Sequence, residues 1–152
     1  MAIERPNPYG AFNYRVTAER FGGSGTVRAG FQEISGLSIE VTIAEYRNGN
    51  EKQNHTRKMN GMSKAGDVTL TRGLIGADDF FKWIKDTRDG LQTVNSTVTI
   101  ELLDEARVGP VMTWILTNAR PMKYEGPALN AKGGTDVALE KLTLSCERVD
   151  IK

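Results

Sequence analysis

Gly76–Gly90, with the sequence GADDFFKWIKDTRDG, is the one stretch that clearly predicts an α-helix. The side chains at helical spacing are Phe80, Phe81, Trp83, Ile84 and Thr87. Of these, we expect Phe80, Trp83 and Ile84 to form the face that holds the helix in place. Acidic residues precede basic ones, which suits the helix dipole, and Gly90 is a typical C-terminal stop. A helix of about a dozen residues is marginal alone in water. The predicted helix, about residues 77–88, must therefore dock on the rest of the chain.

The rest of the chain predicts β-strands, because apolar and polar residues alternate and short turn signals separate the segments. The predicted strands are residues 12–19, 26–34, 38–46, 67–72, 96–104, 111–119, 122–125 and 135–149. Residues 38–46 alternate most clearly, with Ile39, Val41 and Ile43 on one face. We expect a break at Pro121 and a β-bulge near Glu140 and Lys141, where the apolar parity changes.

Short connections between so many strands favour antiparallel pairing. The sequence therefore predicts a mainly β protein, a sandwich or barrel-like pair of antiparallel sheets with one α-helix. Its 152 residues suit a single domain, with residues 1–9 as an irregular N-terminal arm that contains two prolines.

The segment Arg47–Lys58, RNGNEKQNHTRK, has no apolar side chain and carries the turn signal Asn48–Gly49. We call it the polar segment and expect a protruding loop or hairpin. Because the segment has no side chain that could pack in the core of its own subunit, we expect that a partner holds it in an ordered conformation. The alternative is a solvated loop without a partner. The candidate contact residues are Arg47, Asn48, Gly49, Asn50, Glu51, Lys52, Gln53, Asn54, His55, Thr56, Arg57 and Lys58.

Composition argues against several functions. Twenty basic and nineteen acidic side chains give a net charge of +1, so no bulk field attracts nucleic acid or an anionic membrane. His55 is the only histidine and Cys146 the only cysteine, which leaves little for a metal site or a nucleophile–base pair. We expect no catalytic residues, no cofactor and no metal. The sequence shows no signal peptide and no segment of membrane-spanning length, so synthesis in a bacterial cytoplasm is expected.

A set of short motifs resembles the tube proteins of contractile phage tails and related injection machines. The matching segments are Gly30–Leu37, Glu45–Gly49, Val68–Gly73, the helix bearing Trp83, Trp114, Asn118–Pro121, Leu129–Lys132 and Val137–Glu140. Each motif is short, but together they follow the family's order from about Tyr9 to Glu147.

The resemblance implies a structural role. Subunits of this family close into six-fold rings with a β-lined channel, and the rings stack into a tube inside a contractile sheath. The implied partners are further copies of the chain, the sheath protein, baseplate or spike and terminator proteins, and a luminal cargo, tape-measure protein or DNA, with no membrane anchor. In the family the excursion matching the polar segment reaches neighbouring subunits and the adjacent ring, which implies a ring-stacking role. The assembled tail or injection particle can itself be released from the cell.

Other functions stay open at this point. Within the family, the chain fits a tube initiator or a type VI secretion-like tube variant as well as a main tube subunit. Outside the family, a monomeric β-sandwich that binds sugar or peptide would need exposed aromatic side chains, and aromatic residues make up only 7% of this chain. A small hydrolase would need a nucleophile–base pair that the sequence does not show.

Overall fold

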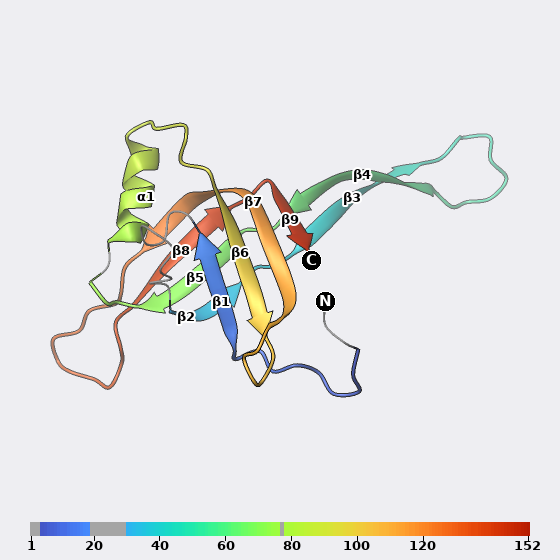
Figure 1. Ribbon diagram of the computed structural model, residues 1–152. Helices are drawn as coiled ribbons and strands as arrows, with labels where there is room; N and C mark the ends of the chain where they lie inside the picture. The colour runs from blue at the N-terminus through green and yellow to red at the C-terminus, as the bar shows by residue number, and fades with distance from the viewer. Residues whose placement is uncertain (1–3, 19–29, 77) are drawn as a thin grey trace.

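Nine strands and one helix make up the computed structural model, which describes residues 4–18, 30–76 and 78–152 (Figure 1). The elements are β1 (Tyr14–Ala18), β2 (Phe31–Ser35), β3 (Ile39–Tyr46), β4 (Arg57–Ala65), β5 (Val68–Gly73), α1 (Asp79–Arg88), β6 (Ser96–Leu103), β7 (Pro110–Glu125), β8 (Leu139–Ser145) and β9 (Arg148–Ile151). All described strand pairs are antiparallel. The predicted mainly β, antiparallel fold with one helix is confirmed. The strand predicted for residues 26–34 begins outside the described residues, and only its later part can be assigned to β2.

The long strand β7 joins the two layers of the fold. Its first part pairs with β6 and β9, whereas its last part, from Arg120 onward, pairs with β8. One layer is therefore β1-β6-β7-β9, and the other is β7-β8-β5-β2. Asn118 lies at φ 51°, a left-handed conformation that asparagine tolerates better than most residues. The predicted strand break at Pro121 is wrong, because β7 continues through the proline. The β7–β8 ladder shifts register between Pro121 and Lys123, next to the residue that has no N–H to donate.

The core lies between these layers. Val16, Ile100 and Leu116 come from the first layer, and Leu70, Leu142 and their neighbours from the second. The β-bulge predicted near Glu140 and Lys141 is wrong, because β5 and β8 pair without a register shift. The change of parity has another cause: Glu140 is buried and occupies the inward position that precedes Leu142.

Helix α1 covers one end of the layers (Figure 1). Phe80 and Trp83 are buried and Ile84 is half-buried. The Trp83 Nε1–H donates to the carbonyl oxygen of Val94 at 2.7 Å. Phe81, which the spacing places with the apolar residues of the helix, is 47% exposed and lies outside the buried face. The narrow stripe of Phe80 and Trp83, three residues apart, is all that the helix buries completely.

Gly90 ends the helix as the sequence predicts. It lies at φ 88°, and the N–H of Leu91 donates to the carbonyl oxygen of Asp86 at 3.1 Å. The N–H of Gly90 donates to the carbonyl oxygen of Thr87 at 3.2 Å. These two bonds are those of a Schellman motif, in which glycine takes the left-handed position without strain. At the other end, Lys82 forms an exposed salt bridge with Asp78, four residues earlier, at an N–O distance of 3.1 Å.

A buried ion cluster fastens α1 to the second layer. Arg72 of β5 is fully buried, forms a salt bridge with Glu140 at 2.5 Å and a second one with Asp79 of the helix. Its guanidinium carbon lies 3.8 Å from the centre of the Phe80 ring. The Tyr124 hydroxyl donates to the second carboxylate oxygen of Glu140 at 3.0 Å. Sequence patterns do not predict this cluster, since buried arginine and glutamate look like surface residues in a one-dimensional pattern.

Protonation in the cluster follows from these contacts. Burial by itself lowers the pKa of Arg72, but hydrogen bonds to Asp79 and Glu140 outweigh it, so the pKa of Arg72 is raised. Burial, then the hydrogen bond to Glu140, also raises the pKa of Tyr124. Arg72 therefore stays charged and forms the salt bridge with Glu140, and Tyr124 stays neutral and donates its hydroxyl proton to the other carboxylate oxygen.

Strands β3 and β4 form a separate two-stranded hairpin that projects away from both layers (Figure 1). Strand β4 is not among the predicted strands, because its sequence, RKMNGMSKA, has no alternation of apolar and polar residues. Its backbone pairs with β3 from Ala65 opposite Ile39 to Arg57 opposite Tyr46. Every residue of β3 is exposed. The alternation of β3 is therefore real, but its apolar face is not part of this subunit's core.

Candidate subunit interface

The polar segment forms the far end of the hairpin, and Arg47 organises it from inside. The Arg47 guanidinium donates to the carbonyl oxygens of Glu51 and Gln53 at 3.1 and 3.2 Å, and to Oδ1 of Asn54 at 3.3 Å. The Glu51 N–H donates to the carbonyl oxygen of Asn48 at 3.2 Å, which closes a turn. Glu51 also forms a salt bridge with Arg57 at 2.9 Å. Bonds within the segment therefore shape it without help from the body of the subunit.

The residues of the polar segment divide into a braced set and an exposed set. Arg47, Asn48 and Glu51 are half-buried within the loop. The exposed residues are Gly49, Asn50, Lys52, Gln53, Asn54, His55, Thr56, Arg57 and Lys58. The last two belong to β4, so the connection between the strands is residues 47–56. Four basic side chains and one acidic side chain give the polar segment a net positive charge.

The hairpin stem presents an apolar stripe on one face. Ile39, Val41 and Ile43 are exposed by 52%, 46% and 48%. On the same face of β4, opposite these three residues in the ladder, lie Ala65, Ser63 and Asn60. The root of the stripe borders the body, because Ile39 shares a hollow with residues 147–150. Beyond the root, Val41 and Ile43 have no part of their own subunit to cover them among the described residues.

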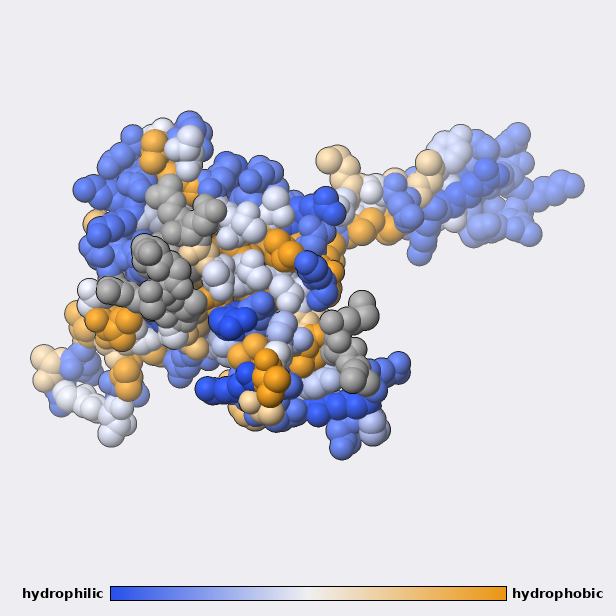
Figure 2. Space-filling model, viewed as in Figure 1, coloured by the Kyte–Doolittle hydropathy of each residue, from blue (hydrophilic) through white to orange (hydrophobic). Residues whose placement is uncertain are grey.

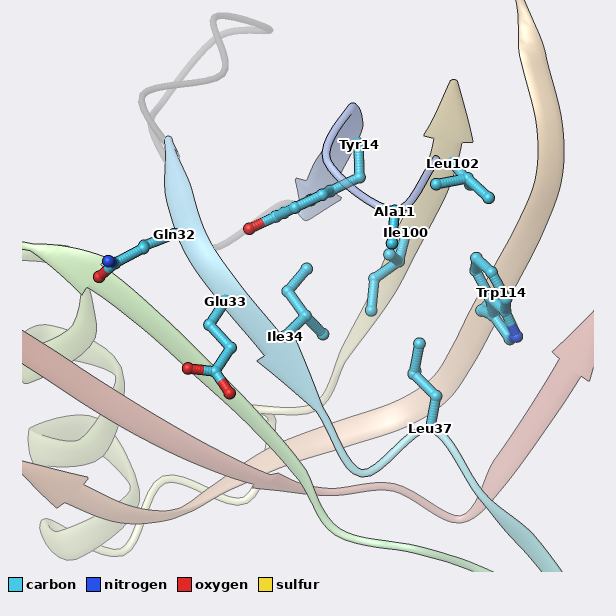
Figure 3. Close-up of a pocket in the computed structure, with 9 residues that line it drawn as sticks. All are labelled: Ala11, Tyr14, Gln32, Glu33, Ile34, Leu37, Ile100, Leu102 and Trp114. Atoms are coloured by element: carbon cyan, nitrogen blue, oxygen red, sulfur yellow. The ribbon is translucent and has the colours of Figure 1, made fainter. Parts of the chain in front are cut away.

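An apolar groove of about 280 Å³ opens between β2 and the first layer. Figure 3 shows Ile34 and Leu37 on one side of it and Ile100, Leu102 and Trp114 on the other. The remaining lining residues are Ala11, Tyr14, Gln32 and Glu33. The groove continues the hydrophobic core outward, since its half-buried side chains pack against the buried core residues.

The groove exists because the two layers do not close upon each other. β1 pairs with β6 and β2 pairs with β5, and no ladder joins β1 to β2 among the described strands. The Tyr14 hydroxyl bridges the gap by donating to the carbonyl oxygen of Phe31 at 2.7 Å. Burial, and then the nearby Glu33 carboxylate, raise the pKa of Tyr14, so this phenol stays a donor. β1, β2 and β9 are thus edge strands, each with a strand partner on one side only among the described residues.

Hydrophilic and hydrophobic residues occupy different parts of the described surface. Figure 2 shows hydrophilic residues over the outer part of the hairpin and hydrophobic residues at its root and on parts of the body. The described part of the N-terminal arm contacts the β6–β7 turn, where Arg5 forms a salt bridge with Glu105 at 2.5 Å. The guanidinium carbon of Arg5 also lies 3.7 Å from the centre of the Tyr9 ring. No group of three metal-ligating side chains occurs in the described ranges. The one helix assigned in them is too short and polar to cross a membrane.

Comparison with known proteins decides the family. A sequence model of the T4-like virus tail tube protein gp19 family matches residues 10–150. The chain belongs to this family. The match covers nearly all of the chain, and it confirms the relation that the motifs predicted. This tail tube protein is therefore a structural subunit of a tail-like tube. A comparison with curated protein sequences finds no match.

Solved structures agree with the family. The tail tube protein is similar to a chain of the extended sheath–tube complex of PVC, an extracellular contractile injection system. The TM-score is 0.80 and the identity 29%, over 97% of this chain and 93% of that chain. For a chain of the tube-terminating cap of the anti-feeding prophage, the TM-score is 0.79 and the identity 26%, over 100% of this chain and 95% of that chain. For the PVC sheath/tube terminator they are 0.77 and 29%, over 99% of each chain.

The structure adds two surfaces that sequence patterns missed. The groove has no sequence signal, because its lining comes from segments far apart in the chain, from Ala11 to Trp114. The hairpin stem had a partial signal in the strong alternation of β3. Recognising the stem also required β4, whose only large apolar side chains are Met59 and Met62, which are 59% and 85% exposed.

Proposed function

We propose that this tail tube protein is the main subunit of the inner tube of a contractile injection particle or phage tail. Six copies close into a ring, and rings stack into a hollow tube inside a sheath. Contraction of the sheath drives the tube through a target envelope, and cargo, tape-measure protein or DNA passes through its lumen. The observation that carries this proposal is the family match over residues 10–150, together with the similarity to the PVC sheath–tube complex.

The edges of the subunit support assembly. β1, β2 and β9 each leave one edge open in the described part of the chain, and the hairpin strands pair only with each other. Open edges of this kind promote uncontrolled aggregation unless another subunit covers them. When one edge of a subunit pairs with a different edge of the next subunit, the contact is heterologous. Repetition of such a contact closes a ring or extends a filament.

Partners follow from the same comparison. Sheath, terminator and baseplate components are the other parts that a main tube subunit contacts, and we propose that this chain contacts them through its outer surface and ring ends. The function is mechanical and not catalytic. The family consists of structural tube proteins, and the ionisable cluster around Arg72 is buried, where it holds the helix and not a substrate.

Purified protein tests the assembly directly. We expect multi-angle light scattering to show a species near 100 kDa, about six times the chain mass of 16.7 kDa, and electron microscopy to show rings and tubes. Assembly rises with protein concentration and with added sheath protein. Single rings that never stack would identify a tube-end component. A strict monomer under all of these conditions would contradict the proposal.

We further propose that the polar segment contacts the adjacent ring and helps rings to stack. The segment stands at the outer end of a hairpin that projects from the body, and its exposed side chains are charged or hydrogen-bonding (Figure 1). Contacts of that kind set orientation and register more than affinity. The internal bonds of Arg47 keep the segment in one shape before it meets a partner, which lowers the entropy cost of binding.

Shortening the hairpin tests this role. Tyr46 and Arg57 face each other in the ladder, so replacement of residues 47–56 by Asn-Gly joins them through a two-residue turn. We expect folded protein that still forms single rings but no longer forms long tubes in electron micrographs. Gly109→Ala in the β6–β7 turn is the control, because it lies outside the polar segment and a Cβ there meets no atom within 4 Å, and tubes should form normally. Long tubes from the shortened variant would reject the stacking role.

A further inference from the structure

We propose that the apolar stripe on the hairpin stem of one copy docks in the apolar groove of a second copy in the same ring. The inference rests on the proposed function, and it deepens that function by naming the two surfaces that form the joint between neighbouring subunits. Both surfaces are open among the described residues of a single subunit: Val41 and Ile43 are about half exposed, and the groove opens between β2 and the first layer.

The geometry prevents the stripe from filling the groove of its own subunit. Leu37 lines the groove, and β3 begins only two residues later at Ile39. From there the chain leaves the groove, and the hairpin projects away from the body (Figures 1 and 3). Each copy therefore carries both the apolar stripe and the apolar groove, but the stripe of one copy can reach only the groove of another copy. Such a contact is heterologous, and it repeats from copy to copy until a ring closes.

The two surfaces match in size. An apolar cavity of about 150 Å³ holds one benzene molecule, so a groove of about 280 Å³ has room for about two branched side chains. Side chains on one face of a strand repeat every two residues, about 6.8 Å apart. Val41 and Ile43 are such a pair, and they lie beyond the root where Ile39 already borders its own body. Two neighbouring aliphatic side chains thus fit a groove with aliphatic walls and the indole of Trp114.

Charge also favours a second copy as the occupant. The polar segment at the end of the hairpin holds four basic side chains and one acidic one, whereas the other 140 residues hold sixteen basic and eighteen acidic ones. The basic end of one copy is therefore attracted to the acidic remainder of the next. On the face of the stripe, Lys58 lies opposite Glu45, so the local charges there balance, and among the described residues Glu33 is the one charged residue that lines the groove.

Mixed cross-linking tests the contact. Two variants, both with Cys146→Ser, carry either Ile43→Cys on the stripe or Leu102→Cys in the groove. After assembly of an equimolar mixture and mild oxidation, we expect a disulfide that joins the two variants, seen as a dimer band and mapped by mass spectrometry. Thr42→Cys, on the opposite face of β3, replaces Ile43→Cys in the control and should give at least about tenfold less cross-link, because a disulfide needs Cβ atoms about 4 Å apart.

Charge substitution gives a second measurement that does not depend on the cysteines. Val41→Glu places a carboxylate where the groove would bury it, and we expect the protein concentration at half-assembly to rise at least about tenfold. Thr42→Glu is the matched control and should assemble nearly as the unmodified protein does. Both side chains are exposed in the single subunit, so both variants should keep its circular dichroism spectrum.

The outcomes separate this inference from the proposed function. Tubes that form without the specific cross-link, or with Val41→Glu at unchanged concentration, overturn the docking inference while the tube function stands; the stripe then faces another component such as the sheath. The specific cross-link in dimers that never close into rings supports the docking contact and rejects the tube. A chain that stays monomeric in every mixture overturns both.

Discussion

Replacement of Arg72 by alanine should lower the free energy of unfolding by about 3–5 kcal/mol, because it leaves the Glu140 carboxylate buried without its cation. Glu140 is 2% exposed, and its other oxygen accepts a hydrogen bond only from Tyr124 among the bonds that the described residues show. The same substitution also frees Asp79 of the helix from its salt bridge and removes the cation from the Phe80 ring. Urea unfolding followed by circular dichroism measures the loss.

A double variant tells charge pairing from side-chain packing. Arg72→Met combined with Glu140→Leu removes both buried charges and keeps most of the volume, so we expect it to recover most of the lost stability. Arg72→Lys should remain destabilised, because one ammonium group cannot replace a guanidinium that bonds two carboxylates at once. A loss below about 1 kcal/mol for Arg72→Ala would show that water reaches Glu140 and that the cluster is not a buried one.

Trp83→Ala should cost a similar amount, about 3–5 kcal/mol, through lost transfer energy and the cavity that remains. The indole is 1% exposed, and its N–H donates to the carbonyl oxygen of Val94, so the variant also leaves that carbonyl without its donor. Phe80 and Trp83 are the buried residues of α1, so without the indole the helix is held mainly by Phe80 and by the salt bridge of Asp79 with Arg72. Chemical denaturation measures the change, and loss of helical signal before global unfolding is expected.

Phe81→Ala on the same helix is the control for Trp83→Ala. Its ring is 47% exposed, so we expect a loss of less than about 1 kcal/mol. The two variants have nearly the same helix propensity change, and their difference isolates burial. A Trp83→Ala protein as stable as the unmodified chain would mean that α1 does not hold the end of the layers together.

Sequence patterns predicted much of the fold, for reasons that the structure makes clear. α1 was predictable because its aromatic spacing, its charges and Gly90 all act within a few residues of one another. The core strands were predictable where one face meets the core and the other meets solvent, as in β6. The predictions failed where a strand departs from that rule: β4 meets no core, and β8 buries Glu140 among leucines.

The candidate interface was only partly predictable. The absence of apolar residues marked the polar segment as a region apart from the core, and its role in stacking is a prediction that the proposed experiments address. The groove was not predictable, because it depends on how β1, β2 and β7 lie relative to one another. The apolar stripe looked like a core strand, since alternation reports that a face is covered but not by which molecule.

The sequence by itself determined the local elements and the family, because helix spacing, strand alternation and short ordered motifs are properties of neighbouring residues. Only the tertiary structure decided which of those faces this subunit covers. Burial of Arg72 depends on Glu140, sixty-eight positions away in the chain, and on Asp79 of the helix. Exposure of Val41 depends on the hairpin pointing away from both layers. Both are set by long-range packing, since the energy of a charge or an apolar face depends on what surrounds it in space.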